Sequence, residues 1–97
     1  MKVKFNSRAN SEARSIAEYY TLEAGAKHAQ QFLDDIEKII DRIKLWPRSF
    51  PVIDANIHRA LLSKYPFVVL YEIESDECAR ILAVRHHKQN PDLGLVS

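Results

Sequence analysis

Four residues of this chain could carry acid–base chemistry on a phosphate. Arg85, His86 and His87 are consecutive, and Arg59 lies upstream of them. Metal-free cleavage of an RNA phosphodiester needs a base for the 2′-hydroxyl, an acid for the leaving oxygen and cations for the developing charge. Arginine is a permanent cation, and histidine titrates near neutral pH. These four residues are therefore the candidate catalytic set if the protein cleaves RNA.

The candidates belong to a cationic stretch near the C-terminal end of the chain. Its basic groups are Arg59, Lys64, Arg80, Arg85 and Lys88, together with His58, His86 and His87. No acidic residue occurs in residues 57–65 or 80–88. The formal net charge of the chain is only +1, so any electrostatic specialisation must be local.

Each candidate also has a purely structural interpretation. Arg59 could pair with Glu72 on a neighbouring strand, which would contribute little if the pair were exposed. His86 and His87 would point to opposite faces of a continuing strand, so at least one of them would pack or face solvent. The carboxylates of Asp34, Asp35, Glu37 and Asp41 resemble a solvated helix face and not a catalytic pair.

Three consecutive strands must position the cationic groups. Alternation of apolar and polar residues predicts strands over His58 to Ser63, Phe67 to Glu74 and Arg80 to His86. The short connections between them predict an antiparallel meander. Phe67, Val69, Tyr71 and Ile73 should share one face of the middle strand, with Tyr71 in the core, and Val68, Leu70 and Glu72 the other.

The first half of the chain predicts one short strand and two helices. Val3 and Phe5 alternate with polar residues, and Ser7 can cap the first helix. Its inner stripe is mostly alanine, whereas Glu12 and its acidic and basic neighbours should keep the outer face solvated. Gly25 can adopt the left-handed conformation that ends a helix near residue 23 or 24.

The second predicted helix has the strongest periodicity in the chain. Its apolar residues recur at spacings of three and four over about 20 residues: Ala29, Phe32, Leu33, Ile36, Ile39, Ile40 and Ile43. Pro47 should end this helix at Trp46, and Trp46 and Phe50 should cover the end of the core. The turn between the helices is short, so they should form an antiparallel hairpin.

Composition and length fit a single α+β domain over residues 1–97. The 46% of hydrophobic residues makes disorder improbable and suffices for one modest core. We expect an N-terminal strand and a helix hairpin packed on an antiparallel sheet of about four strands. The single cysteine, Cys78, excludes an internal disulfide and lacks a second thiol for a metal pair, so we expect neither metal nor cofactor. Without a signal-like or membrane-spanning apolar run, we expect a cytoplasmic protein.

Several segments, in this order, resemble a known superfamily. They are the basic first strand, the helix containing Ala13, Ile16 and Tyr20, the segment AKHAQQFLDDIEKI, the junction from Leu45 to Arg48, the string from Arg59 to Tyr71, and the string from Ile81 to Pro91. Together they resemble the RelE/ParE superfamily, the toxins of bacterial type II toxin–antitoxin or plasmid-stabilisation systems, over nearly the whole chain. The resemblance implies one fold with two activities. RelE-like members cleave ribosome-bound messenger RNA without a metal, and ParE-like members poison DNA gyrase.

The residues favour the ParE branch. RelE-like nucleases carry several lysines and arginines on the central strands and usually a C-terminal tyrosine or histidine. Here the strand from Phe67 to Ile73 has no basic residue, and Leu82 and Val84 are apolar. We therefore favour a gyrase poison, with a ribosome-dependent endoribonuclease as the alternative.

The same resemblance implies a cognate antitoxin that buries apolar residues of the helix hairpin and the sheet, in a hetero-oligomer. A chain that kept only this binding and had lost toxicity is a second alternative. The residues expected to contact partners are Arg59, Lys64, Arg85, His86, Leu22, Leu93 and Leu95.

Overall fold

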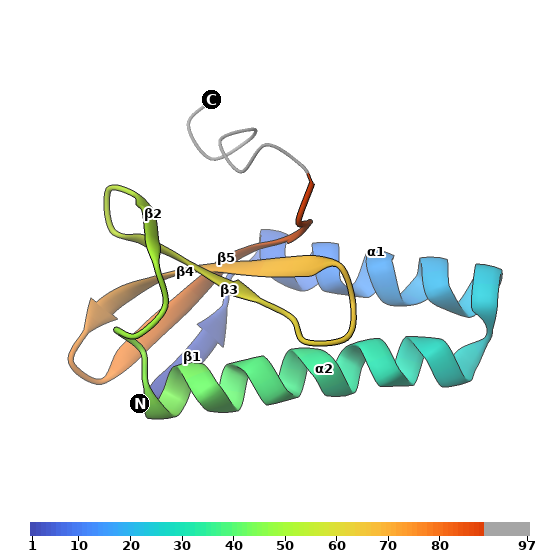
Figure 1. Ribbon diagram of the computed structural model, residues 1–97, viewed down its shortest axis with the longest axis horizontal. Coiled ribbons are helices and arrows are strands. Elements are labelled where there is room, and N and C mark those ends of the chain that lie inside the picture. The colour runs from blue at the N-terminus through green and yellow to red at the C-terminus, as the bar shows by residue number, and fades with distance from the viewer. Residues whose placement is uncertain (89–97) are drawn as a thin grey trace.

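The computed structural model describes residues 1–88, and these form two helices and five strands. The elements in chain order are β1 (Lys2–Phe5), α1 (Ser7–Ala24), α2 (Ala26–Leu45), β2 (Val52–Asp54), β3 (Ile57–Leu61), β4 (Phe67–Ser75) and β5 (Cys78–His86). The two helices run antiparallel, and the sheet lies against them towards the end opposite their connecting turn (Figure 1). The expected α+β class is confirmed. Within residues 1–88, neither helix is both long enough and apolar enough to cross a membrane.

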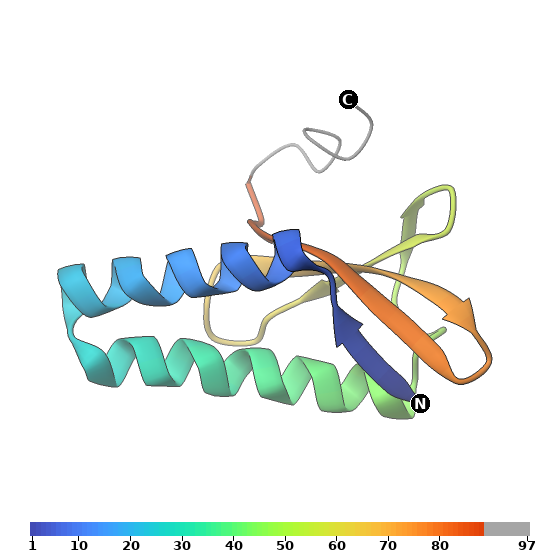
Figure 2. The same cartoon turned by 180° about the vertical axis from the view of Figure 1, so that it is seen from behind.

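The sheet has five strands in the order β1-β5-β4-β3-β2. β2, β3, β4 and β5 pair antiparallel, as expected, but β1 pairs with β5 in parallel, with Lys2 opposite Cys78. The expected fold is therefore confirmed, and the structure refines it with a fifth strand and the parallel pairing of β1. The helix hairpin connects β1 at one edge of the sheet to β2 at the other, and β1 lies beside β5, as the reverse view shows (Figure 2).

The helix ends differ from expectation in detail. The side chain of Asn6, not Ser7, caps α1, because its Oδ1 accepts a 2.8 Å hydrogen bond from the Ala9 amide. Gly25 ends α1 with φ 97° and ψ 163°, so its φ is positive but its ψ is extended instead of left-handed helical. α2 ends at Leu45, with Trp46 as its C-cap.

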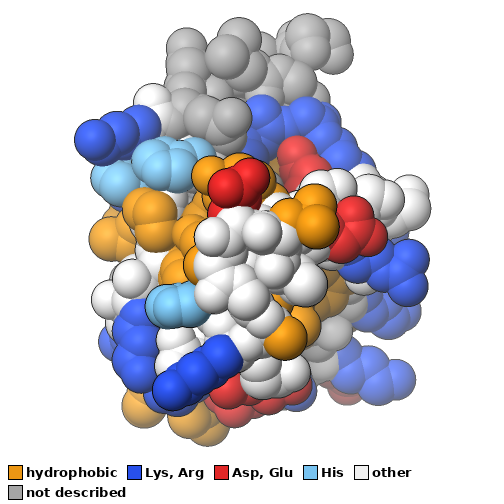
Figure 3. Space-filling model, turned by 90° about the vertical axis from the view of Figure 1, so that its right-hand side faces the viewer, with side chains coloured by type: hydrophobic (Ala, Val, Ile, Leu, Met, Phe, Trp, Pro, Cys, Tyr) orange, Lys and Arg blue, Asp and Glu red, His pale blue; other side chains and the backbone are white. Residues whose placement is uncertain are grey.

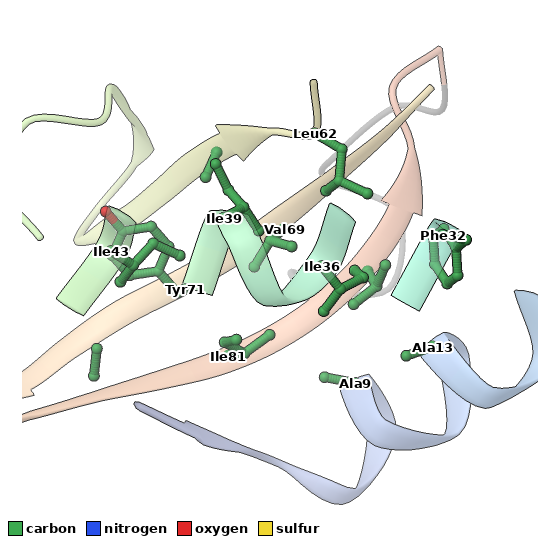
Figure 4. Packing of buried hydrophobic residues seen from close by; sticks show 13 residues of the cluster. Ala9, Ala13, Phe32, Ile36, Ile39, Ile43, Leu62, Val69, Tyr71 and Ile81 are labelled. Carbon is green, nitrogen blue, oxygen red and sulfur yellow. The ribbon is translucent and has the colours of Figure 1, made fainter. Parts of the chain in front are cut away.

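The main core lies between the helix hairpin and one face of the sheet (Figure 4). Phe32, Ile36, Ile39 and Ile43 of α2 share one stripe because they follow the helix period, and they pack against the core-facing side chains of β4 and β5. Val69 and Tyr71 lie in this core, as the alternation along β4 predicted. Ala9 and Ala13 allow α1 to approach closely.

Two expectations, one about the C-cap of α2 and one about its acidic residues, were wrong. Trp46 is 58% exposed and does not cover the core, although Phe50 does pack against it. Asp35 is not solvated with its acidic neighbours, because its side chain is buried and accepts hydrogen bonds from the β3–β4 connection. The acidic spacing on α2 could not reveal this difference, since it depends on where that connection lies.

Candidate partner-binding face

Arg59 and Arg85 lie on the same face of the sheet, the one turned away from the helix hairpin. We call this the outer face. Arg59 is opposite Leu70 in the β3–β4 register, and Arg85 is opposite Val68 in the β4–β5 register. Residues 68 and 70 alternate to the same side of β4, so both arginines flank this strand. Val68 and Leu70 are themselves buried, in a second, smaller apolar cluster with Ala83, so they contribute little surface between the two arginines.

The strand register does not favour the structural interpretation of Arg59. Glu72 lies opposite Ile57 on β3 and opposite Arg80 on β5, not opposite Arg59. Arg80 in turn donates from Nε to the carboxylate of Glu74 at 2.9 Å. That hydrogen bond is the main reason why the pKa of Glu74 is lowered from its ordinary value.

Arg85 is drawn towards α1 by Glu12. Its side chain is only 10% exposed, and its Nη2 lies 3.8 Å from Glu12 Oε2. The other carboxylate oxygen, Oε1, accepts a 3.0 Å hydrogen bond from the Val84 amide. Glu12 therefore joins the first turns of α1 to the end of β5. The prediction that Glu12 belongs to a solvated helix face was wrong, because sequence periodicity could not show that β5 passes beside this face.

His86 and His87 form a stacked pair. Their ring centroids are 5.0 Å apart and the ring planes differ by 20°. The expected opposite orientation was wrong because β5 ends at His86, so the alternation of side chains does not extend to His87. Phe67 packs against this pair, with its ring centroid 5.4 Å from that of His86.

The hydrogen bonds of the two rings assign them complementary roles. Nδ1 of His87 lies 3.1 Å from the carbonyl oxygen of Pro66, and a carbonyl can only accept, so this nitrogen carries the proton. Nδ1 of His86 accepts from the Lys88 amide at 3.2 Å, so in the neutral ring the proton is on Nε2. In the neutral pair, His86 therefore offers an Nε2–H donor and His87 offers an Nε2 lone pair as acceptor.

His58 does not belong with the other cationic groups. It is buried on the core-facing side of β3, where its Nδ1 donates to the Phe50 carbonyl at 2.9 Å and its ring stacks on Tyr71 at 5.0 Å. We therefore assign His58 to the packing of the core.

A hollow of about 330 Å³ lies between α1 and the end of β5. Ser11, Ser15, Ile16, Phe67, Arg85 and His86 are among the residues that line it. Two of the predicted partner-binding residues therefore meet at one recess, whereas Arg59 lies across β4 from it and Lys64 in the β3–β4 connection. Sequence reasoning missed the serine contribution, for which the spacing of four residues on one helix was the only signal.

The helix hairpin presents further exposed apolar groups. Leu22 is 85% exposed and Tyr19 is 59% exposed, so neither side chain is covered by the rest of the described chain. Viewed from the end that carries the α1–α2 turn, hydrophobic, histidine and cationic side chains appear beside one another (Figure 3). The other two predicted apolar contacts, Leu93 and Leu95, lie outside the described residues.

Comparison with known proteins decides the family. A model for the ParE toxin of the type II toxin–antitoxin system parDE matches residues 3–91. The chain belongs to the ParE toxin family. A chain of the chromosomal ParDE system from P. aeruginosa has a similar fold, with a TM-score of 0.70 and 17% sequence identity over 89% of this chain and 95% of that chain. A search of curated proteins gives no significant match.

Membership of the ParE family identifies the protein as a toxin of a type II toxin–antitoxin system and implies an antitoxin partner. It confirms the resemblance to the RelE/ParE superfamily and the choice of the ParE branch. Within residues 1–88, no three histidine, cysteine or acidic side chains gather closely enough to hold a metal ion.

Proposed function

We propose that this ParE-family toxin inhibits DNA gyrase and is neutralised by a cognate antitoxin. The observation that carries the proposal is the composition of the middle of the sheet. β4 has no lysine, arginine or histidine, and Arg59 and Arg85 lie on the two strands that flank it. Phosphoryl-transfer catalysis requires charges to converge on one phosphate. Cations that are separated by an uncharged strand are better suited to the charged rim of a protein interface.

Arg59, Lys64, Arg85 and His86 are the residues that we assign to the gyrase contact. The recess beside α1 gives Arg85 and His86 apolar surroundings, since Ile16 and Phe67 line it as well. Arginine in such a partly desolvated position is typical of residues that dominate protein interfaces. We assign Leu22 to the antitoxin contact because it is an exposed leucine on the helix hairpin, where burial under a partner would be favourable.

A ribosome-dependent endoribonuclease is the second candidate, and one observation favours it. The stacked pair of His86 and His87 supplies a donor and an acceptor nitrogen side by side, as an acid and a base would require. Arg85 lies next to them in the chain. Arg59, the second cation of this candidate set, lies across β4 from Arg85.

Two assays on the purified toxin separate the candidates. One measures gyrase supercoiling and gyrase-dependent DNA cleavage, and the other measures cleavage of messenger RNA on ribosomes. We expect inhibition of gyrase and intact messenger RNA. Messenger cleavage without any effect on gyrase would refute the proposal.

Substitution then tests the assigned residues. Arg85→Ala and His86→Ala should each weaken gyrase inhibition about tenfold or more, as expected for central interface residues. Arg14→Ala removes the same charge from an exposed position on α1 and should have no effect. If the Arg85 and His86 variants inhibit gyrase as well as the Arg14 variant, the assignment of the contact is wrong.

The antitoxin contact has its own measurement. Leu22→Ser should weaken antitoxin binding and leave gyrase inhibition unchanged, because the side chain is exposed and makes little contribution to the core. An unchanged dissociation constant for the antitoxin would exclude Leu22 from that interface.

A further inference from the structure

The side chain of Asp35 anchors the connection between β3 and β4 to α2. The carboxylate lies on α2 and is 2% exposed. Its Oδ1 accepts from the Ser63 hydroxyl at 2.8 Å, and its Oδ2 accepts from the backbone amides of Lys64 at 2.8 Å and Tyr65 at 3.0 Å. The β3–β4 connection follows the surface of α2 in both ribbon views (Figures 1 and 2).

The ionised form of Asp35 is the form that this anchor requires. Burial alone would raise the pKa of Asp35, but the hydrogen bonds from the Lys64 amide and the Ser63 hydroxyl outweigh it. With the Tyr65 amide, they leave the pKa below its ordinary value. Asparagine would replace these charge-assisted hydrogen bonds with weaker neutral ones, and the Ser63 hydroxyl would have to turn from donor to acceptor to meet the amide nitrogen.

The anchored connection holds His87 on its other side. The carbonyl oxygen of Pro66 accepts from the His87 amide at 2.9 Å and lies 3.1 Å from its ring Nδ1. Pro66 directly follows Tyr65, whose amide is bonded to Asp35. The connection is closed by the hydrogen bond from the Leu62 amide to the Phe67 carbonyl at 2.9 Å. The place of the Pro66 carbonyl is therefore set by a short segment with little freedom of its own.

His87 transmits this position to His86. The stacked rings leave His86 between His87 and the edge of Phe67. A continuous series of contacts thus runs from Asp35 through the connection and Pro66 to His87 and His86.

We propose that Asp35 is a positioning residue for the histidine pair, fixing the orientation and tautomer of His87 through the β3–β4 connection. This inference rests on the proposed function only where it assigns the pair to the partner-binding face. Asp35 lies beneath the connection and acts through it.

Nuclear magnetic resonance of the full-length protein tests the geometry without reference to activity. In Asp35→Asn, we expect the His87 amide to exchange with solvent about tenfold or more faster. The imidazole nitrogen shifts of His87 should move from a protonated Nδ1 towards a mixture of tautomers. Asp34→Asn removes the same charge from the neighbouring residue, which faces solvent and bonds only to Gln30 within the described residues, and should change neither reading.

The outcome is decisive in either direction. If the Lys64 and Tyr65 amides exchange faster in Asp35→Asn but His87 keeps its exchange rate and tautomer, the proposal is wrong. A uniform acceleration that includes core amides such as Val69 would show loss of stability instead of positioning, and would also overturn it. If Asp35→Asn does not fold, Ser63→Ala removes one of the three hydrogen bonds, and the same two readings apply with a smaller expected shift.

A gyrase assay on the same variants keeps the two proposals apart. Weaker inhibition by Asp35→Asn, together with altered His87 signals, supports positioning of a functional pair. Altered His87 signals with unchanged inhibition would support the positioning of His87 and remove the histidine pair from the gyrase contact. Failure of wild-type protein to inhibit gyrase would overturn the proposed function and leave the His87 readings valid.

Discussion

Replacing Tyr71 by phenylalanine should destabilise the fold by about 1–2 kcal/mol near neutral pH. The ring is completely buried, and its hydroxyl donates a 2.6 Å hydrogen bond to the carbonyl of Pro47. Phenylalanine fills the same space, so the contacts with Phe50 and His58 should persist. The loss arises because the carbonyl after α2 no longer has this donor.

The same hydroxyl predicts how stability changes at alkaline pH. Burial raises the pKa of Tyr71 to about 12, from an ordinary value of 10.0. Below pH 10 the group is protonated in both states, so its contribution to stability is complete. Between about pH 10 and 12 the unfolded chain loses this proton while the folded chain retains it, so stability falls, by roughly 2–3 kcal/mol once both forms have titrated.

Urea denaturation of wild type and Tyr71→Phe over this pH range measures both effects. The variant should have a lower midpoint near neutral pH, the same denaturant dependence, and a shallower decline above pH 10. Some loss of stability above pH 10 should remain in the variant, because the pKa of Tyr20 is also raised. Burial is the main cause of that shift, and Tyr65 and Tyr19 add smaller effects. If the variant matches wild type at neutral pH and declines as steeply above pH 10, the hydroxyl does not make the contribution that its buried hydrogen bond implies.

Three further substitutions test how the elements are joined. Asn6→Ala should lower the free energy of unfolding by about 1 kcal/mol in urea denaturation, because it removes the cap of α1. Ser7→Ala should leave stability unchanged. A larger loss in Ser7→Ala than in Asn6→Ala would contradict the cap assignment. Glu12→Ala should speed hydrogen exchange at the Val84 amide about tenfold, while Glu12→Gln keeps an acceptor there; equal rates in both variants would contradict the bond. Gly25→Ala should cost about 1–3 kcal/mol in thermal unfolding through its positive φ, since beyond its two chain neighbours nothing lies within 4 Å of an added Cβ. Unchanged stability would show that the turn relaxes freely.

Local patterns predicted most of the elements correctly. The three-and-four spacing from Ala29 to Ile43 identified α2, and alternation along residues 67–73 identified both faces of β4. These patterns repeat within a single helix or strand, so they require no knowledge of what lies nearby. β2 was missed because three residues after Pro51 are too few to show an alternation.

The contacts between different elements were harder to predict from the sequence. Nothing in Lys2 to Phe5 distinguishes a parallel neighbour from an antiparallel one, and nothing in Glu12 or Asp35 distinguishes a solvated carboxylate from one that accepts backbone amides of a distant segment. For the candidate site, residue types identified Arg59, Arg85 and the two histidines. Their arrangement on either side of β4 depended on the strand register, which the sequence does not encode locally.

The pairing of β1 with β5 also has a consequence for the order of events during synthesis. The first strand to leave the ribosome has its neighbour in the last strand, so its hydrogen bonds wait until almost the entire described chain has emerged. The helix hairpin can form early, because its contacts are between adjacent segments. A complete sheet, with Arg59 and Arg85 in place on either side of β4, exists only after translation has passed β5. Chains interrupted before this point would lack the proposed toxic surface, whereas the hairpin assigned to the antitoxin contact would already be present.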